Sequence, residues 1–333
     1  MTAEGAPRPR WAPSLVLAAK VAFSFGLFVF LFGRIPLDQF ADTVGDARPE
    51  WLVAAWVLML ASNVLGSFQW GRLLRVVDIR IPFWKVCAYY HVGLFFNNFL
   101  PANIGGDIAR VLDASRYGPN RTAAFSAVLM DRLIGTVALA GLSLVTTLPA
   151  IDHFHLGLMY GALLGFFALS VTLLWAVFHP ALLPACQRLL ARVGLGRLNP
   201  HLMELTGRLA GYRGQPRLIV QMFGVAAVTQ ISRIGVHVLV ARALGVDVSL
   251  LYFFLFVPLL AVIVSLPISL NGIGVREGAG VVMFGLVGVD RAHAFSLQFM
   301  TYLVAVAVSL LGGLIFLVRI PRRRAEARSL RRS

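Results

Sequence analysis

The sequence predicts an all-α polytopic membrane protein with about eight transmembrane helices and one re-entrant hairpin. Of its 333 residues, 58% are hydrophobic and 14% are charged, whereas soluble domains carry about 25% charged residues. Apolar runs of membrane-spanning length recur along the chain, and the charged residues gather between them. We therefore expect a single integral membrane domain, residues 1–333, whose core covers 15–318.

Seven apolar runs are each long enough to cross about 30 Å of hydrocarbon at about 1.5 Å per residue. The first run lacks a small-residue cleavage site before the polar segment that follows it, so we expect an uncleaved span instead of a signal peptide. Two further apolar stretches, 86–100 and 277–289, are too short to cross comfortably. The seven long runs are 15–33, 51–70, 122–148, 157–178, 218–241, 250–268 and 294–318.

The charges between these runs predict which loops face the cytoplasm. The segment 72–85, the loop 179–217 and the tail 319–333 are rich in Arg, whereas the charged residues of 34–50 and 149–156 are mostly acidic. By the positive-inside rule, the basic segments and both termini face the cytoplasm of a bacterial inner membrane. Regularly spaced leucines and arginines in the basic loop predict a helix on the membrane surface.

Counting crossings between these loops assigns the two short stretches. With both termini inside, 277–289 must cross the membrane, while 86–100 must enter from the cytoplasm and return to it. The latter continues into a polar segment, so we expect a re-entrant hairpin at about 86–110. Irregular backbone at membrane depth must be surrounded by protein or by a water-filled cavity. The hairpin therefore predicts a polar intramembrane cavity.

Polar residues within or beside predicted spans mark the candidate site, because each costs several kcal/mol in lipid. They fall into four groups, two on each side of the middle of the chain. The candidate substrate-binding residues are Asn97, Asn98, Pro101, Gly105, Gly106, Asp107, Arg110, Asp131, Arg132, Arg233, Asn271, Gly272, Gly274, Arg276 and Glu277.

The first two groups leave a ligand site and a structural role open. Gly105 and Gly106 would let backbone amides face an anion at a helix start, although the polar residues around them could equally cap a loop. Asp131 and Arg132 point about 100° apart on a helix, so each needs its own partner. We expect Arg110 to pair with Asp131, either in a ligand site or as an ion pair that locks two helices together.

The other two groups leave a similar choice. Gln230, Arg233 and His237 share one helix face, which predicts that this face points into the bundle. Arg276 could pair with Asp107 or with a phosphate, or form an interface pair with the glutamate beside it. Glycines nearby should prevent a regular helix start there.

Two segments of the chain echo each other. At 100–110 and again at 266–277, Leu-Pro is followed by a polar or glycine-rich bend and then by an Arg with a nearby acid. Such interrupted segments mark the sites of transporters that are built from internal repeats. The echo is compatible with an internal repeat.

Enzyme signatures are missing from the sequence. It holds no phosphate-binding glycine loop that ends in Lys-Ser/Thr, no G-x-S-x-G, no H-E-x-x-H and no Cys cluster with metal spacing. His153 and His155 have no third ligand nearby, so we expect no metal site. We therefore expect no catalysis and no cofactor. Because membrane topology accounts for the surplus of basic residues, we also expect no nucleic-acid partner.

Three motifs resemble those of the lysylphosphatidylglycerol synthase transmembrane-region family, also called UPF0104. They are FFNNFLPANIGGDIAR at 95–110, MDRLIG at 130–135 and PISLNGIGVREG at 267–278. The resemblance covers about 15–318 and implies a flippase-like protein of the stand-alone form, without the soluble aminoacyl-transferase domain. Asp131 stands where family members more often have Glu, a conservative departure.

Residues and resemblance together predict lipid translocation. The anionic head group of a phospholipid or a polyprenyl-phosphate lipid would bind in the polar cavity. One alternative is a non-transporting membrane partner of a glycosyltransferase or another lipid-modifying enzyme. Another is an intramembrane lipid-linked transferase with Asp107 or Asp131 as its acid. The predicted cavity is lined by Arg110, Arg132, Arg233 and Arg276.

Overall fold

The computed structural model describes residues 37–99, 105–148, 157–179, 199–265 and 272–329, with a few isolated positions between 180 and 198. These residues are mostly helical and include no strand, so the protein is an all-α membrane protein as the sequence predicts. The predicted first span at 15–33, the outer loop with His153 and His155, and the end of the tail lie outside the described residues.

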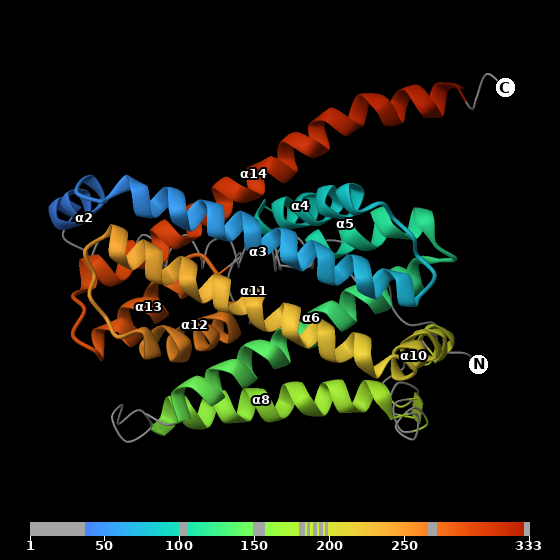
Figure 1. The fold of residues 1–333 in the computed structure, drawn as a ribbon, viewed down its shortest axis with the longest axis horizontal. Coiled ribbons are helices and arrows are strands. Elements are labelled where there is room, and N and C mark those ends of the chain that lie inside the picture. Colours follow the sequence, from blue (N-terminus) through green and yellow to red (C-terminus); the bar gives the residue numbers. More distant parts are fainter. Residues whose placement is uncertain are drawn as a thin grey trace, which may run out of the picture.

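Five helices of the described part are long and apolar enough to cross a membrane. Figure 1 shows them running roughly along the long axis of the molecule. Each coincides with a predicted long run. They are α3 (Pro49–Val76), α6 (Arg121–Thr147), α8 (Gly157–Phe178), α11 (Pro216–Ala243) and α14 (Arg291–Ser329).

The starts of these helices follow from local sequence. Proline occupies the first turn of α3 and of α11, where its missing N–H costs nothing. The Asn120 side chain accepts a hydrogen bond from the Ala123 amide at 2.9 Å and caps α6. Asp290 accepts from the Ala292 and His293 amides before α14. Partial burial raises the pKa of the Asp290 carboxyl, but these hydrogen bonds lower it more, so the pKa lies below its ordinary value.

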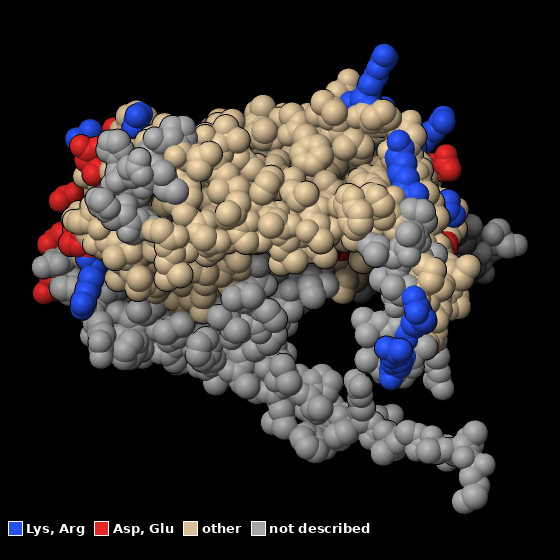
Figure 2. All heavy atoms as spheres, turned by 90° about the horizontal axis from the view of Figure 1, so that it is seen from below, with Lys and Arg blue, Asp and Glu red and all other residues tan. Residues whose placement is uncertain are grey.

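Shorter helices connect the long ones. We name the two ends of the molecule after the short helices that lie there (Figure 1). At the α2 end, α11 stops and α14 begins. At the α10 end, α3 stops and α6 begins. Charged side chains gather at these two ends on the face drawn in Figure 2, with a broad uncharged band between them. The shorter helices are α2 (Leu37–Gly45), α4 (Phe83–Phe99), α5 (Gly105–Ala114), the 3-10 turn η1 (Ser115–Tyr117), α10 (Asn199–Arg213), α12 (Leu250–Ser265) and α13 (Val275–Gly285).

The predicted hairpin at about 86–110 corresponds to α4 and α5, which pack antiparallel. Gly93 faces Arg110, and Asn97 faces Gly106. A Cβ atom on Gly106 would lie 2.0 Å from the Gly93 carbonyl oxygen, so only glycine permits this approach. α5 leads directly through η1 to the start of α6 at the α10 end.

The stretches 250–268 and 277–289, which the sequence predicts to cross the membrane, fall largely in two helices that are each shorter than about 30 Å of hydrocarbon. α13 has 11 residues, or about 16 Å of helix, and α12 before it has 16 residues, or about 24 Å. The two helices pack together, leaving the α2 end and returning to it (Figure 1). They form a second hairpin. A count of crossings does not distinguish such a hairpin from two crossings, because both bring the chain back to the same side.

The order long, short, short, long therefore occurs twice. The first unit is α3, α4, α5 and α6, and the second is α11, α12, α13 and α14. α3 packs along α11, α4 packs against α14, and α12 packs against α6, so each unit holds the hairpin of the other. The hairpins start from opposite ends of the molecule (Figure 1). This is the arrangement of an inverted internal repeat.

The described part of the basic loop forms α10, which docks on the bundle. Leu209 and Tyr212 are buried, and the Tyr212 hydroxyl donates a hydrogen bond to the Leu73 carbonyl oxygen at 3.0 Å. The Glu204 carboxylate accepts from the Asn120 amide and from the Thr122 hydroxyl at the start of α6. α10 thus packs against protein as well as lying at the basic end of the molecule.

Candidate functional site

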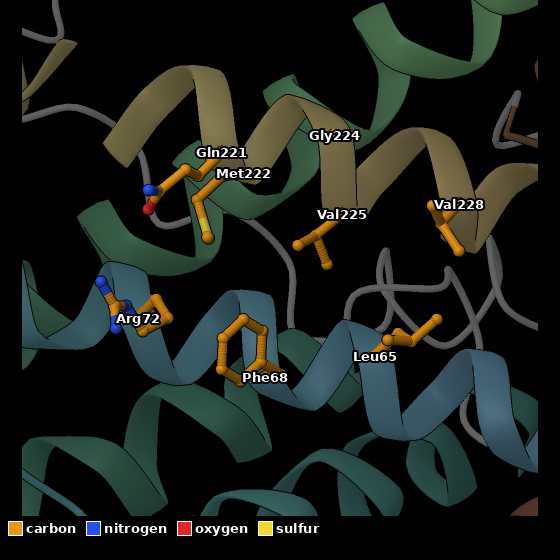
Figure 3. Close-up of a pocket in the computed structure, with 8 residues that line it drawn as sticks. All are labelled: Leu65, Phe68, Arg72, Gln221, Met222, Gly224, Val225 and Val228. Carbon is orange, nitrogen blue, oxygen red and sulfur yellow. The ribbon is translucent and has the colours of Figure 1, made fainter. Parts of the chain in front are cut away.

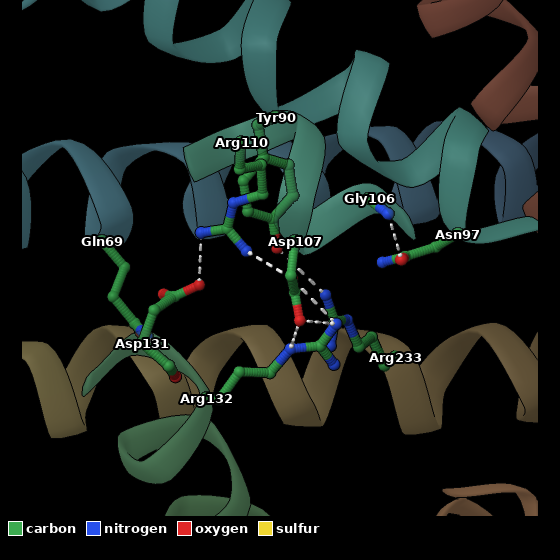
Figure 4. Close-up of polar contacts among 9 residues, drawn as sticks. All are labelled: Gln69, Tyr90, Asn97, Gly106, Asp107, Arg110, Asp131, Arg132 and Arg233. Atoms are coloured by element: carbon green, nitrogen blue, oxygen red, sulfur yellow. Dashed lines mark hydrogen bonds and ion pairs between the residues drawn. The ribbon is translucent and has the colours of Figure 1, made fainter. Parts of the chain in front are cut away.

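A buried ion pair joins the first hairpin to α6 (Figure 4). Arg110 Nη2 lies 2.7 Å from Asp131 Oδ2, and the two residues are 5% and 8% exposed. Gln69 on α3 donates to Asp131 Oδ1 at 2.8 Å. The Arg110 guanidinium also lies 4.4 Å from the Trp70 ring centroid and 4.7 Å from that of Tyr90. The expected pair is present, and it is closed off inside the protein.

A second ion pair beside it is accessible. Arg132 donates to both carboxylate oxygens of Asp107, at 3.0 and 3.1 Å. Asp107 also lies 3.7 Å from Arg110, so it connects the buried and the accessible arginines. The Arg132 side chain is 50% exposed although it stands near the middle of α6, a helix long and apolar enough to cross a membrane. Lipid tails cannot solvate such a group.

A third arginine comes from α11. Arg233 Nη2 donates to the Tyr90 hydroxyl at 3.5 Å, and Figure 4 shows it reaching toward the region of Asp107. Gln230 donates to the Gly135 carbonyl oxygen at 2.9 Å, so the predicted polar face of α11 does point into the bundle. Within the described ranges Arg233 has no ion pair with a carboxylate. We call Asp107, Arg110, Asp131, Arg132 and Arg233 the polar cluster.

A hydrogen bond within the first hairpin joins two of its candidate residues. The Gly106 amide donates to Asn97 Oδ1 at 2.8 Å, so it does not face an anion in this structure. Asn97 and Asn98 are partly buried near the end of α4, and Gly105 begins α5. Pro101 lies outside the described residues.

The second hairpin holds the remaining candidates. Gly272 and Gly274 have φ of 76° and 80°, a conformation that favours glycine, and the Glu277 carboxylate accepts from the Gly274 amide at 2.7 Å. The Arg276 guanidinium lies 4.6 Å from the Tyr302 ring centroid. Of the alternatives for Arg276, an ion pair with Asp107 does not occur among the described residues; Asp107 pairs with Arg132 and lies 3.7 Å from Arg110. Asn271 is not among the described residues.

The two hairpins place related groups alike. The third residue of α5 is Asp107 and the third residue of α13 is Glu277. α5 contacts α6 through Arg132, and α13 contacts α14 through Tyr302 at the equivalent helical position. The internal repeat therefore extends to single positions, because the second helix of each hairpin has an acidic third residue.

Three residues of the cluster's surroundings were missed from sequence. Gln69 interrupts an apolar run, and that polar interruption is a signal that could have found it. Trp70 and Tyr90 give no such signal, because aromatic residues are ordinary in membrane helices. Their role depends on the packing of α3 against α4.

Comparison with protein families gives a match over most of the chain. A family model described as the lysylphosphatidylglycerol synthase TM region matches residues 17–313. The chain belongs to this family. The predicted family resemblance is thus confirmed, and the protein is a multi-pass membrane protein.

Similar proteins carry the name UPF0104 membrane protein. One from Methanothermobacter thermautotrophicus is 23% identical over 297 residues, which cover 83% of this chain and 86% of that protein. One from Pyrococcus horikoshii is 23% identical over 292 residues, covering 80% and 87%. One from Methanocaldococcus jannaschii is 26% identical over 115 residues, which cover 34% of each chain.

Proposed function

We propose that this protein moves lipids between membrane leaflets, without covalent chemistry or a cofactor, by binding an anionic head group at the polar cluster. The head group belongs to a phospholipid or to a polyprenyl-phosphate lipid. The proposal depends most on one observation, the half-exposed Arg132 in the middle of a membrane-spanning helix.

The charge of the polar cluster supports an anionic ligand. It contains three arginines and two aspartates, which leaves one surplus positive charge. A net charge at membrane depth is costly unless a counter-ion balances it. A phosphate satisfies this need and also matches the planar donor fork of arginine.

The arrangement of the hairpins supports transport. Secondary transporters place their sites where the interrupted helices of two inverted repeats meet. The two hairpins here begin at opposite ends, and Arg233 of α11 donates to the Tyr90 hydroxyl of the first hairpin. In the proposed cycle the head group passes Arg132 and Arg233 while the hydrocarbon chains stay in the bilayer. Asp107 holds Arg132 when no head group is bound.

Leaflet transfer in reconstituted vesicles tests this proposal. We expect the variants Arg132→Gln and Arg233→Gln to transfer a fluorescent anionic lipid at least about tenfold more slowly, the effect of losing one charge-assisted bond. Arg242→Gln is the matched control, because Arg242 lies near the end of α11 and stacks on Trp51, 5.2 Å away. The thermal unfolding midpoint of each variant should stay well above the assay temperature, which shows that the protein remains folded.

Two outcomes would contradict the proposal. One is transfer at the wild-type rate in both Arg132→Gln and Arg233→Gln. The other is no transfer by the wild type together with its co-purification with a glycosyltransferase or lipid-modifying enzyme, which would favour a non-transporting partner.

A further inference from the structure

A groove lies between α3 and α11, away from the polar cluster. Its volume is about 440 Å³, within the range of about 300–1,000 Å³ that is usual for ligand pockets. None of its lining residues belongs to the polar cluster. They are Leu65, Phe68 and Arg72 from α3, and Gln221, Met222, Gly224, Val225 and Val228 from α11 (Figure 3).

The groove has one polar end and an apolar remainder. Arg72 and Gln221 stand at the same end on facing helices, and Leu65 and Val228 stand at the other (Figure 3). On each helix the residues at the two ends of the groove are two helical turns apart, or about 10 Å. This length accommodates part of one lipid chain.

The floor of the groove is open because of a glycine. A Cβ atom added to Gly224 would meet no atom within 4 Å. Phe68 and Val228 at its walls are exposed large hydrophobic residues. On a membrane protein such a surface faces hydrocarbon, so the groove opens toward lipid chains.

The polar end calls for an anion. Arg72 is partly buried and makes no hydrogen bond or ion pair within the described part of the chain. It lies at the basic α10 end, which the positive-inside rule predicts to be cytoplasmic. Guanidinium groups bind phosphate through paired N–H donors, and Gln221 adds a neutral donor beside it.

We propose that this groove binds an anionic phospholipid of the cytoplasmic leaflet. One acyl chain lies over Gly224, and the phosphate lies against Arg72 and Gln221. A phospholipid is the molecule that carries both features and already surrounds these helices. The site is separate from the translocation path, and its occupancy does not depend on transport.

Photo-cross-linking tests the site directly. The full chain is reconstituted in phosphatidylcholine vesicles with a trace of phosphatidylglycerol that carries a diazirine midway along one chain. A phosphatidylcholine probe with the same chain is compared with it. We expect adducts on the peptides that contain 65–72 and 221–228, about fivefold more with phosphatidylglycerol, which is the preference that one arginine supplies near anionic lipid.

Two variants separate the polar end from the floor. Arg72→Gln should lower the phosphatidylglycerol adducts to the phosphatidylcholine level, whereas Gly224→Leu should remove the adducts of both probes. Gly165→Leu on α8 is the control, because a Cβ there also meets nothing within 4 Å. It should leave the groove adducts unchanged.

Three results would overturn the proposal. Equal adduct yields for the two probes in the wild type would show ordinary boundary lipid. Full adducts in Gly224→Leu would place the chain elsewhere. A disulfide between Phe68→Cys and a cysteine placed within 15–33, in a background without the native cysteines, would show that the protein itself covers the groove.

Discussion

Burial divides the arginines of the polar cluster into two roles. Arg110 is held between two aromatic rings and paired with Asp131, out of reach of a ligand in this structure. Arg132 is accessible and donates to both carboxylate oxygens of Asp107, in whose place a phosphate could accept the same two hydrogen bonds. The former stabilises the hairpin against α6, and the latter is available for binding.

Arg110→Ala should destabilise the protein strongly. It leaves the Asp131 carboxylate buried without its cation, which costs about 3–5 kcal/mol. We expect a clearly lower thermal unfolding midpoint in detergent. The double variant Arg110→Met with Asp131→Asn should recover most of the loss, because Gln69 can still donate to residue 131. A single variant as stable as the wild type would refute the locking role.

Asp107→Asn should tighten head-group binding. The substitution frees Arg132 from a competing charged hydrogen bond worth about 1.5–3 kcal/mol, so the dissociation constant for an anionic lipid should fall about tenfold. Microscale titration with a short-chain phosphatidylglycerol measures it, with Asp290→Asn as a control outside the cluster. Weaker binding in Asp107→Asn would mean that Asp107 positions Arg132 for the ligand.

Part of the site could be read from the sequence. Four charged residues within apolar runs were predicted to belong to the site because charge is costly in lipid: Arg110, Asp131, Arg132 and Arg233. The pairing of Arg110 with Asp131 was predicted because each of them needs a partner of opposite charge. The role of Gly106 differed from the expectation, because close packing on Gly93 and the bond to Asn97 involve residues whose contacts sequence spacing does not reveal.

At the scale of elements, glycine controls how the first hairpin closes. Gly106→Ala should push α4 and α5 apart, because the new Cβ would meet the Gly93 carbonyl oxygen at 2.0 Å. Overpacking of this kind costs about 1–3 kcal/mol, which a lower unfolding midpoint in detergent should show. Gly161→Ala on α8, where a Cβ meets nothing within 4 Å, is the control. An unchanged midpoint in Gly106→Ala would contradict the packing seen here.

The long helices were predictable and the second hairpin was not. Hydropathy alone located α3, α6, α8, α11 and α14, because burial in lipid requires about 20 apolar residues in each. α12 and α13 together have enough apolar residues for two short spans. Only their packing against each other and against the long helices of both units distinguishes a hairpin from two crossings.

For the whole molecule, the inverted repeat predicts which loops share a side. In a variant without native cysteines, Ser249→Cys and Val289→Cys flank the second hairpin, and both should react with a membrane-impermeant thiol reagent from the same side. Ser115→Cys, which follows the first hairpin, should react only from the opposite side. The extent of labelling at each position is compared between intact cells, where the reagent reaches one side only, and opened membranes, where it reaches both. Positions 249 and 289 on opposite sides would contradict the hairpin.

The central claim is that the polar cluster binds an anionic lipid head group, and native mass spectrometry of the purified protein tests it most directly. The account predicts that the wild type retains a phosphate-bearing lipid and that the double variant Arg132→Gln with Arg233→Gln loses it, while Arg242→Gln retains it. Equal retention of the same lipid by the wild type and the double variant would contradict the account.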